Sequence, residues 1–192
     1  YKKYDFSFYS IYDTTFNEDW LVEAGIRYDF SHINSYKYYR TYLWEERNYN
    51  ELFPEFLVED LGLNSLTNPK FDFHNVSSNL GVRYSFNRGE NIYLNYSISS
   101  RKPNPSELFS EGLHHSSARI EIGDLSFTSE VGNNVSVTYN LSSEKSALTL
   151  NSFVNYVNDF IYIIPVRTTS TLAGVFPVWE YMQADANLYG FD

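Results

Sequence analysis

Long runs in which apolar and polar residues alternate constrain this chain more than any other feature. Residues 20–30 show the pattern most clearly, since apolar side chains from Trp20 to Phe30 occupy every second position, with Glu23 and Arg27 between them. Such alternation places the two kinds of side chain on opposite faces of a β-strand. The same period recurs in seven segments: residues 3–13, 20–30, 74–86, 91–101, 131–141, 146–164 and 178–190. An all-β fold is therefore predicted.

The length of these segments separates a membrane barrel from a soluble sheet. A transmembrane strand needs roughly 9–11 residues, whereas strands of soluble proteins average about 5–6. Every segment is long enough to cross a membrane. One face of each strand carries Asn, Ser, Asp and Arg, and the other is apolar with Tyr, Phe or Trp near its ends. An apolar band flanked by aromatic residues is typical of outer-membrane barrels.

The connections between the segments give a second, independent signal. Residues 14–19, 87–90 and 142–145 form short polar stretches, whereas residues 31–73, 102–130 and 165–177 form long ones. Short and long connections alternate along the chain. Outer-membrane barrels have short periplasmic turns and long extracellular loops. The strands that begin at Trp20, Asn91 and Ser146 are therefore expected to run outward.

Seven strands do not close a bacterial barrel, because such barrels have an even strand count from eight upward and open edges are not tolerated in lipid. Either residues 36–50 contain a further strand, or the barrel continues beyond both ends of the chain. We expect continuation, since the alternation begins near Tyr1 and still runs at Gly190. Residues 1–192 are then a partial β-barrel domain, and a complete small protein is the alternative.

Five stretches, met in order, resemble one family of barrels. Residues 99–110 read Ser-Ser-Arg-Lys-Pro-Asn-Pro-Ser-Glu-Leu-Phe-Ser, which resembles the late-barrel signature Ser-x-Arg-x-Pro followed by Ser-Glu-Leu-Phe of TonB-dependent outer-membrane receptors. The other matching stretches are residues 21–29, residues 111–134 with Glu-Val-Gly-Asn-Asn at 130–134, residues 155–162 and residues 183–190. Together they cover most of the chain apart from the long loops.

The resemblance implies a barrel of about twenty-two strands closed by an N-terminal plug. This chain would be the middle-to-late part of that barrel, without the plug. The resemblance also implies active uptake of a scarce nutrient in the bacterial outer membrane, such as a ferric siderophore, haem or another metal complex. Energy would come from the TonB complex through the plug, and the partners would be outer-membrane lipid and the metal chelate or haem. A passive porin or structural barrel is the first alternative, and a soluble extracellular β-sheet binding module is the second.

Composition excludes other functions. The net charge of −10 argues against nucleic-acid binding, which needs a basic surface. The chain has no cysteine, so a disulfide framework and Cys-based metal sites are excluded. The mean hydropathy of −0.40 and the lack of a long apolar run exclude a transmembrane helix. No catalytic motif is present, so we expect no enzyme, no catalytic residue and no permanently bound cofactor.

Two loop segments supply candidate substrate contacts. His114 and His115 lie beside Glu111 and Arg119 in the second long loop. Histidine and carboxylate side chains suit zinc or another transition metal, which makes His114 and His115 the candidate metal ligands. However, adjacent residues of an extended chain point in opposite directions. A solvated polar loop that contacts an iron chelate or haem is the alternative.

The first long loop carries a dense aromatic cluster. Tyr39, Tyr42 and Trp44 are its candidate contact residues, and Arg40 and Arg47 lie among the aromatic residues between Tyr36 and Tyr49. Aromatic and arginine side chains are favoured binding anchors. The cluster could cradle an aromatic siderophore or a haem plane. Alternatively, residues 36–50 continue a long strand beyond the membrane and form part of its aromatic girdle.

Overall fold

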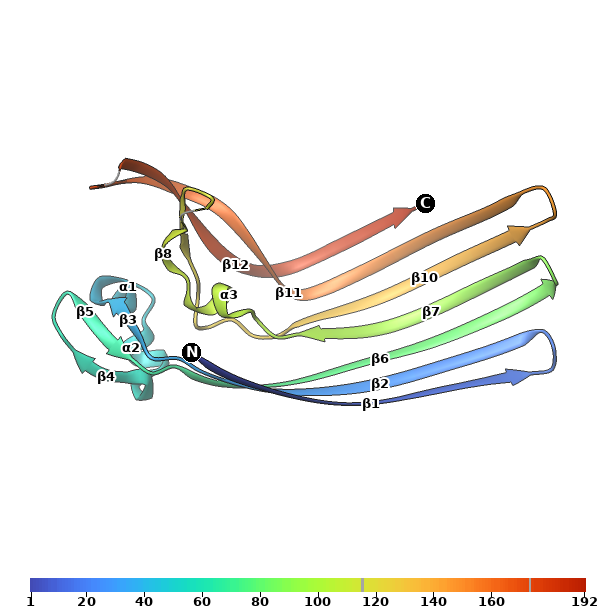
Figure 1. The fold of residues 1–192 in the computed structure, drawn as a ribbon, viewed down its shortest axis with the longest axis horizontal. Helices are drawn as coiled ribbons and strands as arrows, with labels where there is room; N and C mark the ends of the chain where they lie inside the picture. Colours follow the sequence, from blue (N-terminus) through green and yellow to red (C-terminus); the bar gives the residue numbers. More distant parts are fainter. Residues whose placement is uncertain (115, 173) are drawn as a thin grey trace. The chain divides into compact units, whose positions relative to one another are not determined.

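The computed structural model describes residues 1–114, 116–172 and 174–192, and most of them lie in β-strands (Figure 1). The chain divides into two compact units, one of residues 1–7 and 29–74 and the other of residues 8–28 and 75–192. The seven predicted long strands are all present: β1 (Lys2–Phe16), β2 (Trp20–Asn34), β6 (Lys70–Asn87), β7 (Glu90–Arg101), β10 (Glu130–Ser142), β11 (Ala147–Thr171) and β12 (Gly174–Phe191). This confirms the prediction of an all-β fold.

Consecutive long strands are neighbours in one antiparallel sheet. The strand order is β1-β2-β6-β7-β10-β11-β12, to which two short strands, β9 and β8, are added beside β12. In the larger unit, the turns of the three hairpins β1–β2, β6–β7 and β10–β11 lie at the same end of the strands (Figure 1). These turns are short, as predicted, and Gly89 closes one of them with its N–H donating to Asn87 Oδ1 at 3.0 Å.

Strand β7 exposes its apolar face and partly covers its polar face, the reverse of a strand in a soluble protein. Ile92, Leu94 and Tyr96 are 36%, 51% and 43% exposed. Asn91 and Asn95, on the other face, are only half-exposed. A soluble sheet buries its apolar face against a second layer, whereas a membrane barrel turns that face toward lipid. The outer face is therefore the apolar one, as the sequence predicts.

Glycine and aromatic residues interlock on the polar face. A Cβ built on Gly81 would lie 2.0 Å from the Tyr93 hydroxyl oxygen, so the ring of Tyr93 covers the space that a side chain would fill. The same hydroxyl donates to Glu23 Oε2 at 3.1 Å. Tyr93 of β7 thus reaches across β6 to β2 because Gly81 carries no side chain.

We expect Gly81→Ala to destabilise the full-length protein by about 1–3 kcal/mol. The methyl group would displace Tyr93 and break its charge-assisted hydrogen bond with Glu23, a bond that contributes energy of this order. Urea unfolding of the protein refolded into liposomes measures the loss. The control Ser97→Ala, on the same face of β7, should change the midpoint little. An unchanged midpoint for Gly81→Ala would contradict the close packing of Tyr93.

The prediction of a third long loop at residues 165–177 is wrong. Strands β11 and β12 remain paired up to Thr171 and Gly174, so this stretch forms the end of a long hairpin. The two prolines at the ends of this stretch are accommodated within the strands. A register shift separates Pro165 from Arg167, and Pro177 pairs with Thr168. Proline lacks an N–H and is tolerated at such irregular positions.

One face assignment is also wrong. The alternation in residues 178–190 predicts that Met182, Ala184, Ala186 and Leu188 lie on the lipid-facing side. In the structure Leu188 pairs with Asn155 and Ala186 with Val157, and Asn155 in turn pairs with Asn134 of β10. Since directly opposed residues share a face, Ala186 and Leu188 lie on the polar side. Small and weakly polar residues in β12 made its two faces too similar to distinguish.

The first long loop folds as a small subdomain. Residues 36–50 therefore form neither a further barrel strand nor a long strand that continues beyond the membrane, which corrects these two predictions. Strand β3 (Lys37–Arg40) is short and pairs with β5 (Asn64–Thr67) in a separate sheet of order β3-β5-β4. Between them lie α1 (Thr41–Glu46), α2 (Tyr49–Leu52), the 3-10 turn η1 (Pro54–Phe56) and β4 (Leu57–Asp60). We call residues 35–69 the loop subdomain.

The second long loop contains α3 (Pro105–Phe109), β8 (Glu111–His114) and β9 (Arg119–Ile122). Strand β9 pairs with β8 on one side and, in parallel, with β12 on the other. Ile120 and Ile122 of β9 bury themselves against Val178 of β12. The loop is thus packed on the hairpin of β11 and β12. None of the helices among the described residues is long and apolar enough to span a membrane.

Candidate substrate-binding surface

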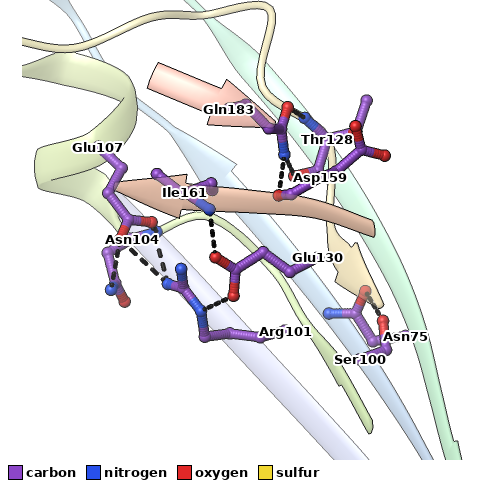
Figure 2. Close-up of polar contacts among 10 residues, drawn as sticks. All are labelled: Asn75, Ser100, Arg101, Asn104, Glu107, Thr128, Glu130, Asp159, Ile161 and Gln183. Carbon is purple, nitrogen blue, oxygen red and sulfur yellow. Dashed lines mark hydrogen bonds and ion pairs between the residues drawn. The ribbon is translucent and has the colours of Figure 1, made fainter. Parts of the chain in front are cut away.

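An ion-pair network of Arg101, Glu107 and Glu130 lies where strand β7 passes into the second long loop (Figure 2). Arg101 Nε donates to Glu130 Oε2 at 2.6 Å, and Arg101 Nη1 donates to both carboxylate oxygens of Glu107 at 3.0 and 3.1 Å. Both glutamates are 8% exposed. Buried carboxylates need such charged and hydrogen-bonded partners, because desolvation of an unpaired charge is costly.

Glu107 explains the local structure of the motif that follows Arg101. The Asn104 backbone N–H donates to Glu107 Oε2 at 2.7 Å (Figure 2), which places Glu107 in a capping box at the start of α3. Pro105 follows at the first helical position, where its missing N–H has no cost. The spacing between Arg101 and Glu107 therefore serves to turn the chain at the end of β7 and begin α3.

The second oxygen of Glu130 reaches strand β11. Glu130 Oε1 accepts the backbone N–H of Ile161 at 2.5 Å. Ile161 lies just after a bulge between Val157 and Phe160, in which Asp159 has the left-handed φ of 55°. Gln183 Nε2 donates to the carbonyl of Asp159 at 2.8 Å. The bulge is thus held by side chains of the strands on both sides of β11 (Figure 2).

The predicted contact residues Glu111, His114 and Arg119 are brought together on the β8–β9 hairpin. Glu111 and His114 are the end residues of β8, and His114 pairs with Arg119 of β9. His114 is exposed, and its Nδ1 lies 3.1 and 3.0 Å from the hydroxyls of Ser116 and Ser117. His115 lies outside the described residues. A shallow pocket of about 250 Å³ is lined by residues 110–114 and Glu121.

Arg119 forms part of a cluster whose other members the sequence reasoning missed. Its guanidinium pairs with Glu121 at 2.7 Å and lies 4.8 Å from the centre of the Trp179 ring. Glu121 Oε2 also accepts from the Tyr181 hydroxyl at 3.4 Å. The parallel pairing of β9 with β12 brings these residues together. No sequence signal marks a short strand that pairs with a strand nearly 60 residues away.

Three other carboxylates of the second long loop, which could have joined the histidines at a metal, are bound to other side chains. Glu107 binds Arg101, Glu121 binds Arg119, and Asp124 Oδ1 accepts from Ser126. Across the described part of the chain, no group of three or more His, Cys, Asp or Glu side chains could hold a metal ion. Metal binding by His114 and His115 stays a prediction.

In the loop subdomain, two of the three aromatic candidates are buried. Tyr39 and Trp44 are 5% and 2% exposed, and both pack against Tyr49. Tyr42 is 52% exposed, and its hydroxyl accepts from Arg40 Nη1 at 3.1 Å. Tyr39 and Trp44 therefore serve as the core of the subdomain, and Tyr42 presents the surface on which a contact can form.

The family model described as "TonB dependent receptor-like, beta-barrel" matches residues 1–192. The chain belongs to this family. It is therefore a β-barrel segment of the outer membrane of Gram-negative bacteria, as predicted. No curated protein matches the chain.

Solved structures share this fold at low sequence identity. The haemophore receptor HasR of Serratia marcescens, solved with its haemophore HasA and haem, has a TM-score of 0.64 at 15% identity, with 98% of this chain and 31% of HasR covered. The copper transporter OprC has a TM-score of 0.69 at 14% identity, with 98% and 25% covered. The siderophore receptor PirA of Pseudomonas aeruginosa has a TM-score of 0.51 at 11% identity, with 97% and 38% covered. The chain thus spans between a quarter and two fifths of these receptors.

Proposed function

We propose that the chain is part of the barrel of an outer-membrane receptor that takes up a scarce nutrient with energy delivered by TonB. The observation that carries the proposal is the family match over all 192 residues, because members are TonB-dependent receptors. The strand faces support it, since a polar face runs along the inside of the predicted barrel and an apolar face along the outside. No catalytic chemistry is required for this function.

Each of the two long outer loops is proposed to contribute contacts to the substrate. The β8–β9 hairpin presents Glu111, His114 and Arg119, and the loop subdomain presents Tyr42. Charged and aromatic side chains of this kind suit a metal chelate or haem. The fold neighbours include receptors named for haem with its haemophore, copper and a siderophore. A ferric siderophore, haem or another metal complex is therefore the proposed substrate class, as cargo rather than as a resident cofactor.

Growth of a strain that lacks the full-length gene tests this function. We expect a growth defect in medium limited for iron, haem or zinc, relieved when the gene is restored. The relief should vanish when the gene is restored in a background without TonB, because passive diffusion does not supply the energy for uptake. Relief that persists without TonB would instead support a passive porin. Unchanged growth under all three limitations would remove the proposed substrates.

A further inference from the structure

Two segments that are distant in sequence meet at several points at the outer end of the larger unit. One is the second long loop, with α3, β8 and β9, and the other is the outer half of the β11–β12 hairpin. They meet through the pairing of β9 with β12, where Ile120, Ile122 and Val178 are buried. They are linked again through Glu130, whose carboxylate accepts from Arg101, the last residue of β7 before the loop, and from Ile161 in the hairpin.

The two carboxylate oxygens of Glu130 have different partners. One oxygen accepts from Arg101, whose other nitrogen holds Glu107 of α3, so this oxygen fixes the start of the loop. The other oxygen accepts from Ile161, at the bulge where the outer half of the hairpin begins (Figure 2). Glu130 thus joins the root of the loop to the root of the hairpin. A second link is made by Gln183 of β12, whose side chain forms hydrogen bonds with the backbone of Thr128 in the loop and with the carbonyl of Asp159 (Figure 2).

We propose that Glu130 is a positioning residue. It sets the loop against the hairpin and so places Arg119 and Glu121 on Trp179 and Tyr181; these four residues are called the outer-loop surface. The β9–β12 pairing extends over only three residue pairs. A short strand pair between two long segments is sensitive to any rotation at their roots. A carboxylate that joins both roots removes that freedom.

The distance between the tips of the two segments measures this effect. The chain has no cysteine, so spin labels can be placed at Ser116→Cys on the β8–β9 turn and Val175→Cys on the hairpin. The measurement uses the full-length receptor in lipid, with any cysteine outside these 192 residues replaced, and electron-electron resonance gives the distribution of distances. A difference in gel mobility between unheated and heated samples confirms that each variant is folded before heating. The proposal rests on the proposed function only in treating the outer-loop surface as one that binds substrate. The distance measurement needs no substrate, so it can fail or succeed independently of the transport proposal.

We expect one narrow distribution in the parent and a broad one, extending to longer distances, in Glu130→Ala. Glu130→Gln retains an oxygen for the Ile161 N–H but loses the charged pair with Arg101, so its distribution should be intermediate. The matched control is Arg167→Gln, which removes an ion pair with Glu180 inside the hairpin alone. It should leave the parent distribution unchanged.

Parent-like distributions in both Glu130 variants would overturn the proposal, because the β9–β12 pairing and the contacts of Gln183 with Thr128 would then suffice to hold the loop. If Glu130→Ala does not fold, Glu130→Gln decides the question by the same criterion. A loss of folded protein without a change in the distances of the folded fraction would show a role in stability alone, and would also overturn the proposal.

Discussion

Replacing Leu94 with arginine is expected to destabilise the full-length barrel by about 2–4 kcal/mol, because an arginine that faces the bilayer near its midplane costs this much. Leu94 lies in the middle part of β7 on the apolar face and is 51% exposed in the described chain. In a soluble protein an exposed leucine tolerates such a change with little effect. The decrease in the free energy of unfolding therefore shows whether this face contacts lipid or water. Denaturant titration of the protein refolded into liposomes measures it.

The matched control is Asn95→Arg, the next residue of the same strand. Asn95 lies on the polar face, opposite Gly81 and Ser136 in the neighbouring strands. A lumen-facing arginine remains in a polar environment, so a much smaller change is expected. Equal losses for Leu94→Arg and Asn95→Arg would contradict the assignment of the two faces.

Trp44→Ala is expected to cost the loop subdomain about 3–5 kcal/mol, the usual loss when a large buried aromatic side chain is removed. Trp44 is 2% exposed, and its ring lies 5.6 Å from Tyr39 and 5.2 Å from Tyr49. A subdomain of this size has no second core to compensate. Hydrogen exchange of residues 35–69 in the full-length receptor should rise sharply, while exchange in the long strands should not change.

Tyr42→Ala separates folding from binding in the same subdomain. Because Tyr42 is exposed, its truncation should change hydrogen exchange little. If Trp44→Ala left exchange as slow as Tyr42→Ala does, the aromatic cluster would not be the core of the subdomain. A preformed ligand cradle, one of the two alternatives that the sequence left open, would then be favoured.

The seven long strands could be predicted because their signal is local. Each strand shows alternation with period two over eleven or more residues, because each of its side chains faces either lipid or the lumen. The hairpin turns are likewise marked by polar residues of their own. The prediction failed where that signal weakened. In β12, alanine, asparagine and leucine make both faces similar, and the structure assigns Ala186 and Leu188 to the polar side.

The candidate site was only partly predictable for a different reason. Glu111, His114 and Arg119 stand out by residue type, and the structure places them on one hairpin. The partners of Arg101 were not foreseen, because Glu130 lies 29 residues away and joins it only through the pairing of β7 with β10. The burial of Tyr39 and Trp44 was not foreseen either. An aromatic cluster in a loop has the same composition whether it forms a core or a binding surface.

The most direct test of the account is the sidedness of single cysteines in intact cells. The chain itself has no cysteine, so Ser117→Cys in the β8–β9 turn and Glu144→Cys in the β10–β11 turn can be introduced into the full-length receptor, with any other cysteine replaced. A thiol reagent that cannot cross the outer membrane should label Ser117→Cys in intact cells, and Glu144→Cys only after the outer membrane is permeabilised. Labelling of both positions in intact cells, or of Glu144→Cys alone, would contradict a barrel that spans the membrane with its long loops outside.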